Sequence, residues 1–327
     1  MLRACTEPLS TVYDVALLDL DGVVYVGDAA VPGAPGHLAQ ARAAGMHLAF
    51  VTNNAARQPS EVAEHLTKLG VAVDASEVVT SSQAAARLLA EKLGRGAKIF
   101  VIGGTGLYHA LLAEGLVPVQ SFEEEPDAVV SGYHPDLTWR TVVDGSILVR
   151  RGLPWVASNA DATLPTPHGP GPGHGVLAGA IAAFASTQPE VAGKPEPPLF
   201  EETMRRVGGK HPLVVGDRLD TDIEGAVRVG FDSLLVMTGV TGLRDLVAIP
   251  AALRPTYVAA DLQGLGTPHG VPEGGVLGGW RGTVEDGGLR ITGNGGVDDW
   301  WRVAATVAWR HLDAAGTPLT VEAVLVP

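Results

Sequence analysis

The chain has 327 residues, which is long for one domain and short for three, so its length predicts two domains with a small appendage. Apolar residues make up 46% and charged residues 18%, which excludes a disordered or fibrous chain. The 23 basic and 36 acidic residues give a formal net charge of −13, which excludes a protein that neutralises nucleic-acid phosphates over a broad surface.

The cysteine content and the N-terminal segment predict the cellular compartment. Cys5 cannot form an intramolecular disulfide and has no neighbouring metal-ligating residues. The first residues, MLRACTEPLSTVYD, lack the apolar core of a signal peptide, and no stretch approaches the roughly 18 apolar residues of a membrane span. We therefore expect a cytoplasmic protein with no membrane partner.

Seven short runs rich in Val, Leu and Ile end in small or polar residues, a pattern typical of buried parallel strands. In chain order they cover residues 15–22, 47–54, 98–104, 127–133, 154–161, 212–218 and 232–239. Alanine-rich stretches between them predict helices, several ending at a glycine, over residues 33–45, 60–70, 81–94 and 222–230. The alternation predicts an α/β fold with a doubly wound parallel sheet.

Acidic residues follow two of these strands, where open α/β sheets carry their chemistry. Asp19 and Asp21 are two residues apart, so their side chains project to the same side of the strand end. Asp217 and Asp222 follow a later strand and can join them. Four converging carboxylates repel one another unless a hard divalent cation such as Mg²⁺, or a lysine, neutralises them.

Three further residues predict phosphate binding beside these carboxylates. Thr52 and the backbone N–H that follows it, that of Asn53, offer hydrogen-bond donors, and Lys194 offers a positive charge. Each signal has a structural explanation by itself: Asp222 as a helix cap, Asp21-Gly22 as a turn, and Lys194 as a solvated lysine. Together, in the order and context that one mechanism requires, they predict a phosphoryl-transfer site.

Four segments, VALLDLDGVVYVG, FVTNN, AGKPEP and VVGDRLDTDIEGA, resemble the four motifs of the haloacid dehalogenase (HAD) superfamily of phosphatases. More narrowly, the chain resembles its NagD-type, or p-nitrophenyl phosphatase, branch, from about Val15 to about Asp261. The resemblance implies a Rossmann-like core with a large α/β cap inserted between the second and third motifs. One departure is Ala55, where members of the branch often have a serine that binds phosphate.

The resemblance also implies a role for each motif residue. Asp19 is expected to be the nucleophile that forms an aspartyl-phosphate, and Asp21 the general acid and then base. The side chains of Asp19 and Asp217 and the backbone carbonyl of Asp21 are expected to bind Mg²⁺, with Asp222 outside its direct ligands. Residues expected to hold the phosphoryl group are Thr52, Asn53 through its backbone, and Lys194.

The resemblance divides the chain into a catalytic core of residues 1–83 and 187–265 and a cap of residues 84–186. Within the cap, Asn159 and Asp161 resemble an element of the branch that faces the substrate, so both are candidate specificity residues. His134 is a weaker candidate, because a histidine beside a proline in a loop is usually just exposed. We expect 165–175, PTPHGPGPGHG, to be a loop, whose glycines and prolines disfavour a metal site at its two histidines.

Residues 268–327 lie outside the resemblance and predict a small α+β extension of ββαβ order. Its elements are a hairpin turning at Asp286-Gly287, a helix over 297–316 and a last strand within 317–326. A unit of about sixty residues is marginally stable alone, so we expect it to pack on the core or to complete a homodimer interface. We assign Trp300, Trp301 and Trp309 to its core or docking face rather than to base stacking.

These features predict an Mg²⁺-dependent phosphomonoesterase that acts on a small-molecule phosphate ester. The resemblance places glycerol 3-phosphate first and 2-phosphoglycolate second. Two alternatives stay open at this point. One is a phosphotransferase or mutase, in which a sugar hydroxyl accepts the phosphoryl group, and the other is a non-catalytic sensor of phosphorylated metabolites.

Overall fold

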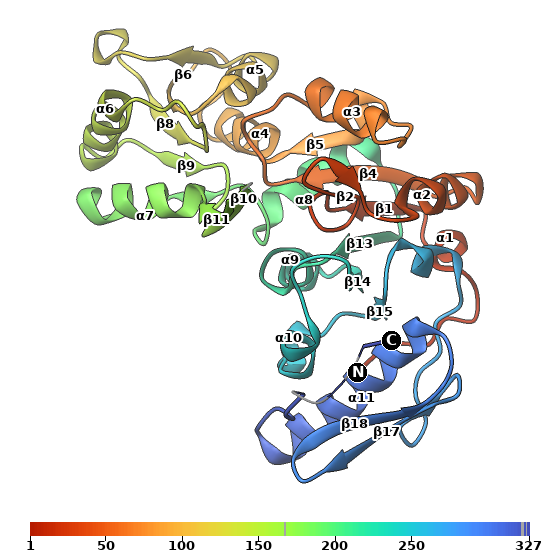
Figure 1. Ribbon diagram of the computed structural model, residues 1–327. Helices are drawn as coiled ribbons and strands as arrows, with labels where there is room; N and C mark the ends of the chain where they lie inside the picture. Colours follow the sequence, from red (N-terminus) through yellow and green to blue (C-terminus); the bar gives the residue numbers. More distant parts are fainter. Residues whose placement is uncertain (167, 322–323, 325) are drawn as a thin grey trace. The chain divides into compact units, whose positions relative to one another are not determined.

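The computed structural model describes residues 1–166, 168–321, 324 and 326–327, and it divides into two units (Figure 1). The first unit consists of Met1–Ala49, Leu69–Ala72 and Gly209–Pro327, and the second of Phe50–Lys68 and Val73–Gly208. Strand β4 (His47–Thr52) begins in the first unit and ends in the second. Among the described residues no helix is both long and apolar enough to span a membrane.

The first unit is built on parallel strands in the order β15-β14-β13-β1. They are β1 (Val15–Leu18), β13 (Pro212–Gly216), β14 (Asp232–Val236) and β15 (Tyr257–Ala259). Every residue of β1 is buried, which explains its uninterrupted apolar sequence. The remaining elements here are α1 (Leu9–Val12), β2 (Tyr25–Val26), β3 (Ala29–Ala30), α2 (Ala34–Ala43), η3 (Leu219–Ile223), α9 (Glu224–Val229), α10 (Leu243–Val247), η4 (Ala251–Leu253) and η5 (Leu262–Gly266).

The C-terminal extension belongs to the first unit and packs on its strands. It contains β16 (Val276–Leu277), β17 (Trp280–Glu285), β18 (Gly288–Gly293) and α11 (Val297–Ala315), and α11 contacts β15 and α10 (Figure 1). Trp300 and Trp309 are buried in the same apolar cluster as Leu246 and Val258. The Nε1–H of Trp309 donates to the carbonyl of Leu246 at 2.7 Å. The prediction that the extension packs on the core is therefore confirmed.

Two of the extension's predicted elements are confirmed and the third is only partly described. The hairpin turns at Asp286 and Gly287, whose φ values of 50° and 75° suit a tight hairpin turn, and the predicted helix is α11. Within the predicted last strand, residues 322, 323 and 325 lie outside the described residues. Among the described ones, Thr320 forms an isolated bridge with Gly288.

The second unit contains the end of β4, paired with β5 (Val78–Thr80), and a five-stranded parallel sheet in the order β12-β9-β8-β6-β7. These strands are β6 (Lys98–Ile102), β7 (Val117–Val119), β8 (Ala128–Ser131), β9 (Trp155–Ala157) and β12 (Glu190–Val191). Its other elements are α3 (Pro59–Lys68), η1 (Ala75–Glu77), α4 (Ser81–Leu93), α5 (Thr105–Ala113), η2 (Phe122–Glu124), α6 (Trp139–Arg150), β10 (Thr163–Thr166), β11 (Gly169–Pro172), α7 (His174–Ala185) and α8 (Pro197–Val207).

The seven predicted strands and four predicted helices all occur, but the predicted loop over 165–175 differs. Strands β10 and β11 pair antiparallel there, and α7 begins at His174. Residue 167 of the predicted loop lies outside the described residues. Glycine and proline are depleted in sheets in general, but a two-stranded ribbon has only edge strands, where proline is tolerated. Composition alone therefore indicated a loop where a short ribbon forms.

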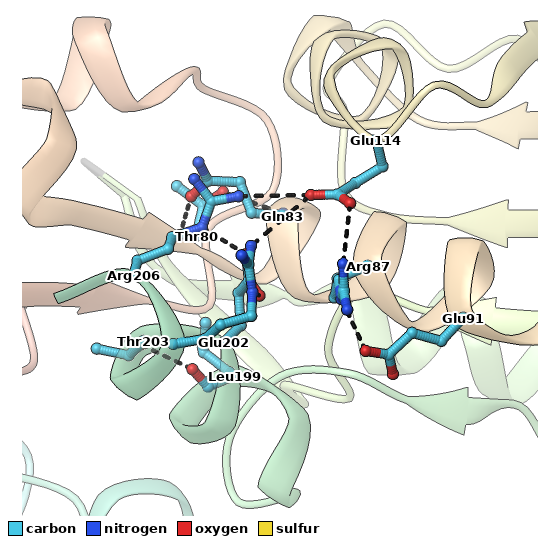
Figure 2. Close-up of polar contacts among 10 residues, drawn as sticks. Thr80, Gln83, Arg87, Glu91, Glu114, Leu199, Glu202, Thr203 and Arg206 are labelled. Carbon is cyan, nitrogen blue, oxygen red and sulfur yellow. Dashed lines mark hydrogen bonds and ion pairs between the residues drawn. The ribbon is translucent and has the colours of Figure 1, made fainter. Parts of the chain in front are cut away.

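A network of ion pairs joins three helices within the second unit (Figure 2). Glu114, at the end of α5, lies 3.6 Å from Arg87 of α4 and 3.9 and 3.8 Å from Arg205 and Arg206 of α8. Arg205 also donates two hydrogen bonds, of 2.7 and 2.8 Å, to the buried carboxylate of Glu202. The network therefore ties α5, from the predicted cap, to α8, from the predicted core.

Candidate active site

Three carboxylates gather at the ends of β1 and β13 in the first unit. Oxygens of Asp19, Asp217 and Asp222 all lie within 4.8 Å of one another. Asp217 and Asp222 are almost completely buried, whereas Asp19 is half-buried. Parallel pairing of β1 with β13 brings the two strand ends together, and the Asp19 N–H donates to the carbonyl of Val215 at 2.9 Å.

Glycines and backbone N–H groups fix these carboxylates in place. A Cβ at Gly239 would collide with Asp217 Oδ2, and a Cβ at Gly216 would collide with the Asp222 carboxylate. The Val240 N–H donates to Asp217 Oδ2 at 2.6 Å. Asp222 lies in the π-helical turn η3 and accepts the Arg218 N–H at 3.2 Å, so its carboxylate is directed back toward the end of β13.

Asp21 differs from these three carboxylates because it is exposed. The Tyr25 hydroxyl lies 3.4 Å from Asp21 Oδ2 and donates to it. The turn between them requires Gly22, whose φ is 84° and whose carbonyl accepts the Thr238 hydroxyl at 2.5 Å. An accessible carboxylate with a fixed orientation is suited to exchanging protons with a substrate and with water.

The three gathered carboxylates fit a magnesium ion. Their donors are all oxygens, which hard divalent cations prefer. Two unit charges 4 Å apart repel by about 4 kcal/mol at the effective dielectric typical near a protein surface, so three close carboxylates gain stability from a bound cation. The structure therefore places Asp19 and Asp217 where the sequence predicted metal ligands, and Asp222 beside them.

The predicted phosphate-binding residues Thr52, Asn53 and Lys194 lie in the second unit, where the Asn53 side chain bonds to the backbone of Lys194. Asn53 Oδ1 accepts the Lys194 N–H at 2.8 Å, and Asn53 Nδ2 donates to the Lys194 carbonyl at 3.0 Å. Lys194 is buried, and its Nζ donates to the Val51 carbonyl at 3.4 Å. Thr52 is also buried, and its Oγ1 accepts the Asn54 N–H at 3.1 Å, which leaves the hydroxyl hydrogen to donate elsewhere.

The candidate specificity residues of the cap also contact Asn53. Asn159 Nδ2 donates to the Asn53 carbonyl at 2.7 Å, and Asn53 Nδ2 donates to Asp161 Oδ1 at 2.9 Å. Asn159 is buried, whereas Asp161 is half-buried. His134 lies in a loop beside Gly104, and its Nδ1 accepts the Asp136 N–H at 3.2 Å.

The histidines of 165–175 form no metal cluster within the part of the chain that the structure describes. His174 is buried at the start of α7, and its Nε2 lies 3.1 Å from the Ser131 hydroxyl. Burial lowers the pKa of His174 to about 4, so the ring is neutral near pH 7.

Sequence reasoning missed the residues that support the predicted site. After β14, Gly239 leaves room for the Asp217 carboxylate, and the Val240 N–H donates to that carboxylate. Ser81 donates to the Asn53 carbonyl at 2.7 Å. The one sequence signal for Gly239 was that a glycine closes the apolar run over 232–239. Ser81 looked like any residue near the start of a helix, and only the fold brings it to Asn53.

Comparison with known proteins agrees with this geometry. A family model described as haloacid dehalogenase-like hydrolase matches residues 16–117, and a HAD-hydrolase-like model matches residues 191–265. D-glycerol 3-phosphate phosphatase from Mycobacterium tuberculosis is 40% identical over 322 residues, covering 95% of this chain and 90% of that protein. An acid sugar phosphatase from Staphylococcus saprophyticus is 33% identical over 252 residues, covering 76% of this chain and 95% of that protein.

Two solved phosphatase structures are also similar to this chain. The glycerol phosphate phosphatase from Mycobacterium tuberculosis, crystallised with magnesium, matches with a TM-score of 0.85 at 39% identity, covering 96% of this chain and 94% of that one. A 4-nitrophenylphosphatase from Thermotoga maritima matches with a TM-score of 0.73 at 31% identity, covering 79% and 98%. The predicted HAD fold is therefore confirmed, and this chain belongs to the haloacid dehalogenase-like hydrolases.

Proposed function

We propose that this protein is an Mg²⁺-dependent phosphomonoesterase that hydrolyses a small phosphorylated metabolite through an aspartyl-phosphate on Asp19. The observation that carries the proposal is the cluster of Asp19, Asp217 and Asp222, whose carboxylate oxygens lie within 4.8 Å of one another at two strand ends. The 40% identity to a D-glycerol 3-phosphate phosphatase supports glycerol 3-phosphate as the first substrate. The resemblance to the NagD-type branch keeps 2-phosphoglycolate second.

In the first step, the Asp19 carboxylate attacks phosphorus, and the ester P–O bond breaks. Asp21 enters this step protonated and gives its proton to the leaving alkoxide. The Thr52 hydroxyl, the Asn53 N–H and the Lys194 ammonium hold the phosphoryl oxygens as the bond breaks. The products are the free alcohol and Asp19 esterified to phosphate.

In the second step, Asp21, now ionised, takes a proton from a water molecule. The resulting hydroxide attacks the phosphorus of the aspartyl-phosphate, which releases inorganic phosphate and restores the Asp19 carboxylate. The Tyr25 hydroxyl, 3.4 Å from Asp21 Oδ2, keeps that carboxylate oriented between the two proton transfers.

The groups that would hold Mg²⁺ are the side chains of Asp19 and Asp217 and the backbone carbonyl of Asp21. Asp222 lies beside them, held by the Arg218 N–H, and would not bind the ion directly. When bound, the ion neutralises the carboxylates and draws charge from the phosphoryl oxygens. Support for this ion comes from the oxygen-only donor set and from the relative that was crystallised with magnesium.

The domain organisation and location predicted from the sequence also stay part of this proposal. We propose that residues 84–186 form a cap on a core of residues 1–83 and 187–265, a division that differs from the two units of the structure. We also propose a cytoplasmic location. Cell fractionation would test the location, and size-exclusion chromatography with light scattering would test whether the chain is a monomer or a homodimer.

Phosphate release from a panel of small phosphate esters tests the function. We expect turnover with Mg²⁺ and none with EDTA, with the highest kcat/KM for glycerol 3-phosphate. Release of phosphate without any acceptor would exclude a phosphotransferase. Tight binding of the esters with no turnover of any of them would contradict the proposal and favour a sensor.

A further inference from the structure

Asn53 is the centre of a buried hydrogen-bond cluster in the second unit. Its side-chain amide has one acceptor oxygen and two donor hydrogens, and all three are used, on the Lys194 N–H, the Lys194 carbonyl and Asp161 Oδ1. Reversing the amide would place its nitrogen against the Lys194 N–H and its oxygen against a carboxylate and a carbonyl. The partners therefore permit one orientation.

This amide holds the backbone of Lys194 by both its N–H and its carbonyl. Gly193 packs directly against the same group, because a Cβ at Gly193 would lie 2.5 Å from Asn53 Oδ1 and 3.0 Å from Asn159 Cβ. The Lys194 ammonium extends from a backbone that is held on both sides. The fixed backbone and the bond from Nζ to the Val51 carbonyl together limit where the ammonium can lie.

Asn53 is itself held by three side chains. Its carbonyl accepts hydrogen bonds of 2.7 Å from Ser81 Oγ and from Asn159 Nδ2, and its amide donates to Asp161 at 2.9 Å. Asn159 also bonds to Asp161, because its Oδ1 accepts the Asp161 N–H at 3.2 Å. Asn159 follows β9 and Lys194 follows β12, and these two strands are paired in parallel.

We propose that Asn159 and Asp161 are positioning residues that act through Asn53, rather than residues that select the substrate. Through the Asn53 carbonyl and side-chain amide they hold the residue whose backbone N–H binds the phosphoryl group, and through the same amide they hold the backbone of Lys194. This inference rests on the proposed function of Asn53 and Lys194. It assigns to both cap residues an effect on the phosphoryl group, which every substrate shares, and none on the alcohol.

Replacing Asp161 distinguishes a positioning role from a role in selecting the substrate. Asp161→Ala removes an acceptor from the Asn53 amide, and we expect kcat/KM to fall roughly ten- to hundredfold for glycerol 3-phosphate, 2-phosphoglycolate and p-nitrophenyl phosphate alike. The inhibition constant of inorganic phosphate should rise in parallel. Asp161→Asn keeps an acceptor oxygen without the charge, so we expect activity within about threefold of the wild type.

A matched pair of serines controls for the loss of a buried hydrogen bond. Ser81 and Ser82 are both fully buried at the start of α4, but Ser81 donates to the Asn53 carbonyl and Ser82 to the Ala55 carbonyl at 3.0 Å. Ser81→Ala should lower kcat/KM for all three esters and weaken phosphate inhibition. Ser82→Ala should lower the melting temperature similarly and leave both kinetic constants unchanged.

Opposite results would overturn the inference. If Asp161→Asn were as impaired as Asp161→Ala, or if either variant changed the ratio of kcat/KM between esters by more than about threefold, Asp161 would contact substrate directly. Equal kinetic effects of Ser81→Ala and Ser82→Ala would also contradict it. Failure of the wild-type chain to hydrolyse any ester would instead contradict the proposed function, so the two failures are distinguishable.

Discussion

The carboxylate cluster of the first unit and the Asn53 cluster of the second differ in how their charges are balanced. Asp19, Asp217 and Asp222 bring three carboxylates within 4.8 Å, so the cluster concentrates negative charge. The Asn53 amide is neutral, and each of its polar atoms has a partner within the protein. The first cluster is thus built to bind an ion, at a cost in stability, whereas the second stabilises the fold whether or not a ligand is bound.

The largest expected effect comes from the nucleophile in the carboxylate cluster. Asp19→Asn keeps the size of the side chain but removes the attacking charge, so kcat should fall roughly 10⁴- to 10⁶-fold. Steady-state phosphate release measures it. A fall of less than tenfold would mean that another group attacks phosphorus.

A smaller loss is expected when a glycine behind the carboxylates gains a methyl group. Gly239→Ala places a Cβ against Asp217 Oδ2 and must displace that carboxylate, so kcat/KM should fall roughly a hundredfold. Gly36→Ala is the matched control, because its added Cβ meets nothing within 4 Å in helix α2. It should keep full activity and gain up to about 1 kcal/mol of stability. Equal activities of the two variants would mean that the position of Asp217 does not matter.

Thermal melts with and without Mg²⁺ test whether the carboxylate cluster and the Asn53 cluster have separate roles. At a hundred times its dissociation constant, a bound ion adds about 2.7 kcal/mol to the stability of the wild type, so the melting temperature should rise. Asp217→Asn should lose this rise. Asn53→Ala should keep the rise but melt at a lower temperature under both conditions. If Asn53→Ala abolished the rise, or Asp217→Asn kept it, the two clusters would not have separate roles.

A separate effect concerns pH and two buried histidines, His174 in the second unit and His269 in the first. Burial lowers the pKa of His174 to about 4, and burial followed by the nearby Arg302 lowers that of His269 to about 4. Between about pH 6.5 and pH 4 the unfolded chain binds protons that the folded chain does not. Stability should therefore fall as the pH falls through this window, by up to about 1.4 kcal/mol per pH unit for each histidine.

His174→Gln tests the contribution of the second unit. The glutamine can still bond to Ser131 but does not titrate. Urea denaturation of this variant between pH 6.5 and pH 4 should show a weaker loss of stability than in the wild type. An unchanged slope would mean that His174 is not neutral in the folded protein.

The sequence predicted which residues lie at strand ends better than it predicted long-range contacts between side chains. The α/β fold and the placement of Asp19, Asp217 and Asp222 followed from apolar runs that end in acidic residues, because β1 and β13 are buried parallel strands. The contacts of Asn159 and Asp161 with Asn53 span more than a hundred residues. No local pattern encodes such a contact, and the prediction that these two residues select the substrate rested on the family resemblance alone.

For the C-terminal extension too, the sequence predicted local elements better than their packing. Its hairpin and helix were predicted from turn residues and periodicity, but its packing on β15 was only one of two alternatives. The match to the Mycobacterium tuberculosis phosphatase covers 95% of this chain, which leaves about 16 residues unmatched, so most of residues 268–327 have a counterpart there. Trp309, which is fully buried and bonded to Leu246, ties the extension to the first unit.

Identification of the phosphorylated residue tests whether Asp19 is the nucleophile. The enzyme would be mixed with glycerol 3-phosphate and Mg²⁺, quenched in acid during turnover, digested and examined by mass spectrometry. We predict phosphate on the peptide that contains Asp19, and none on any peptide of Asp19→Asn. Phosphate on another residue, or rapid turnover with no phosphorylated peptide in the quenched wild type, would contradict an aspartyl-phosphate on Asp19.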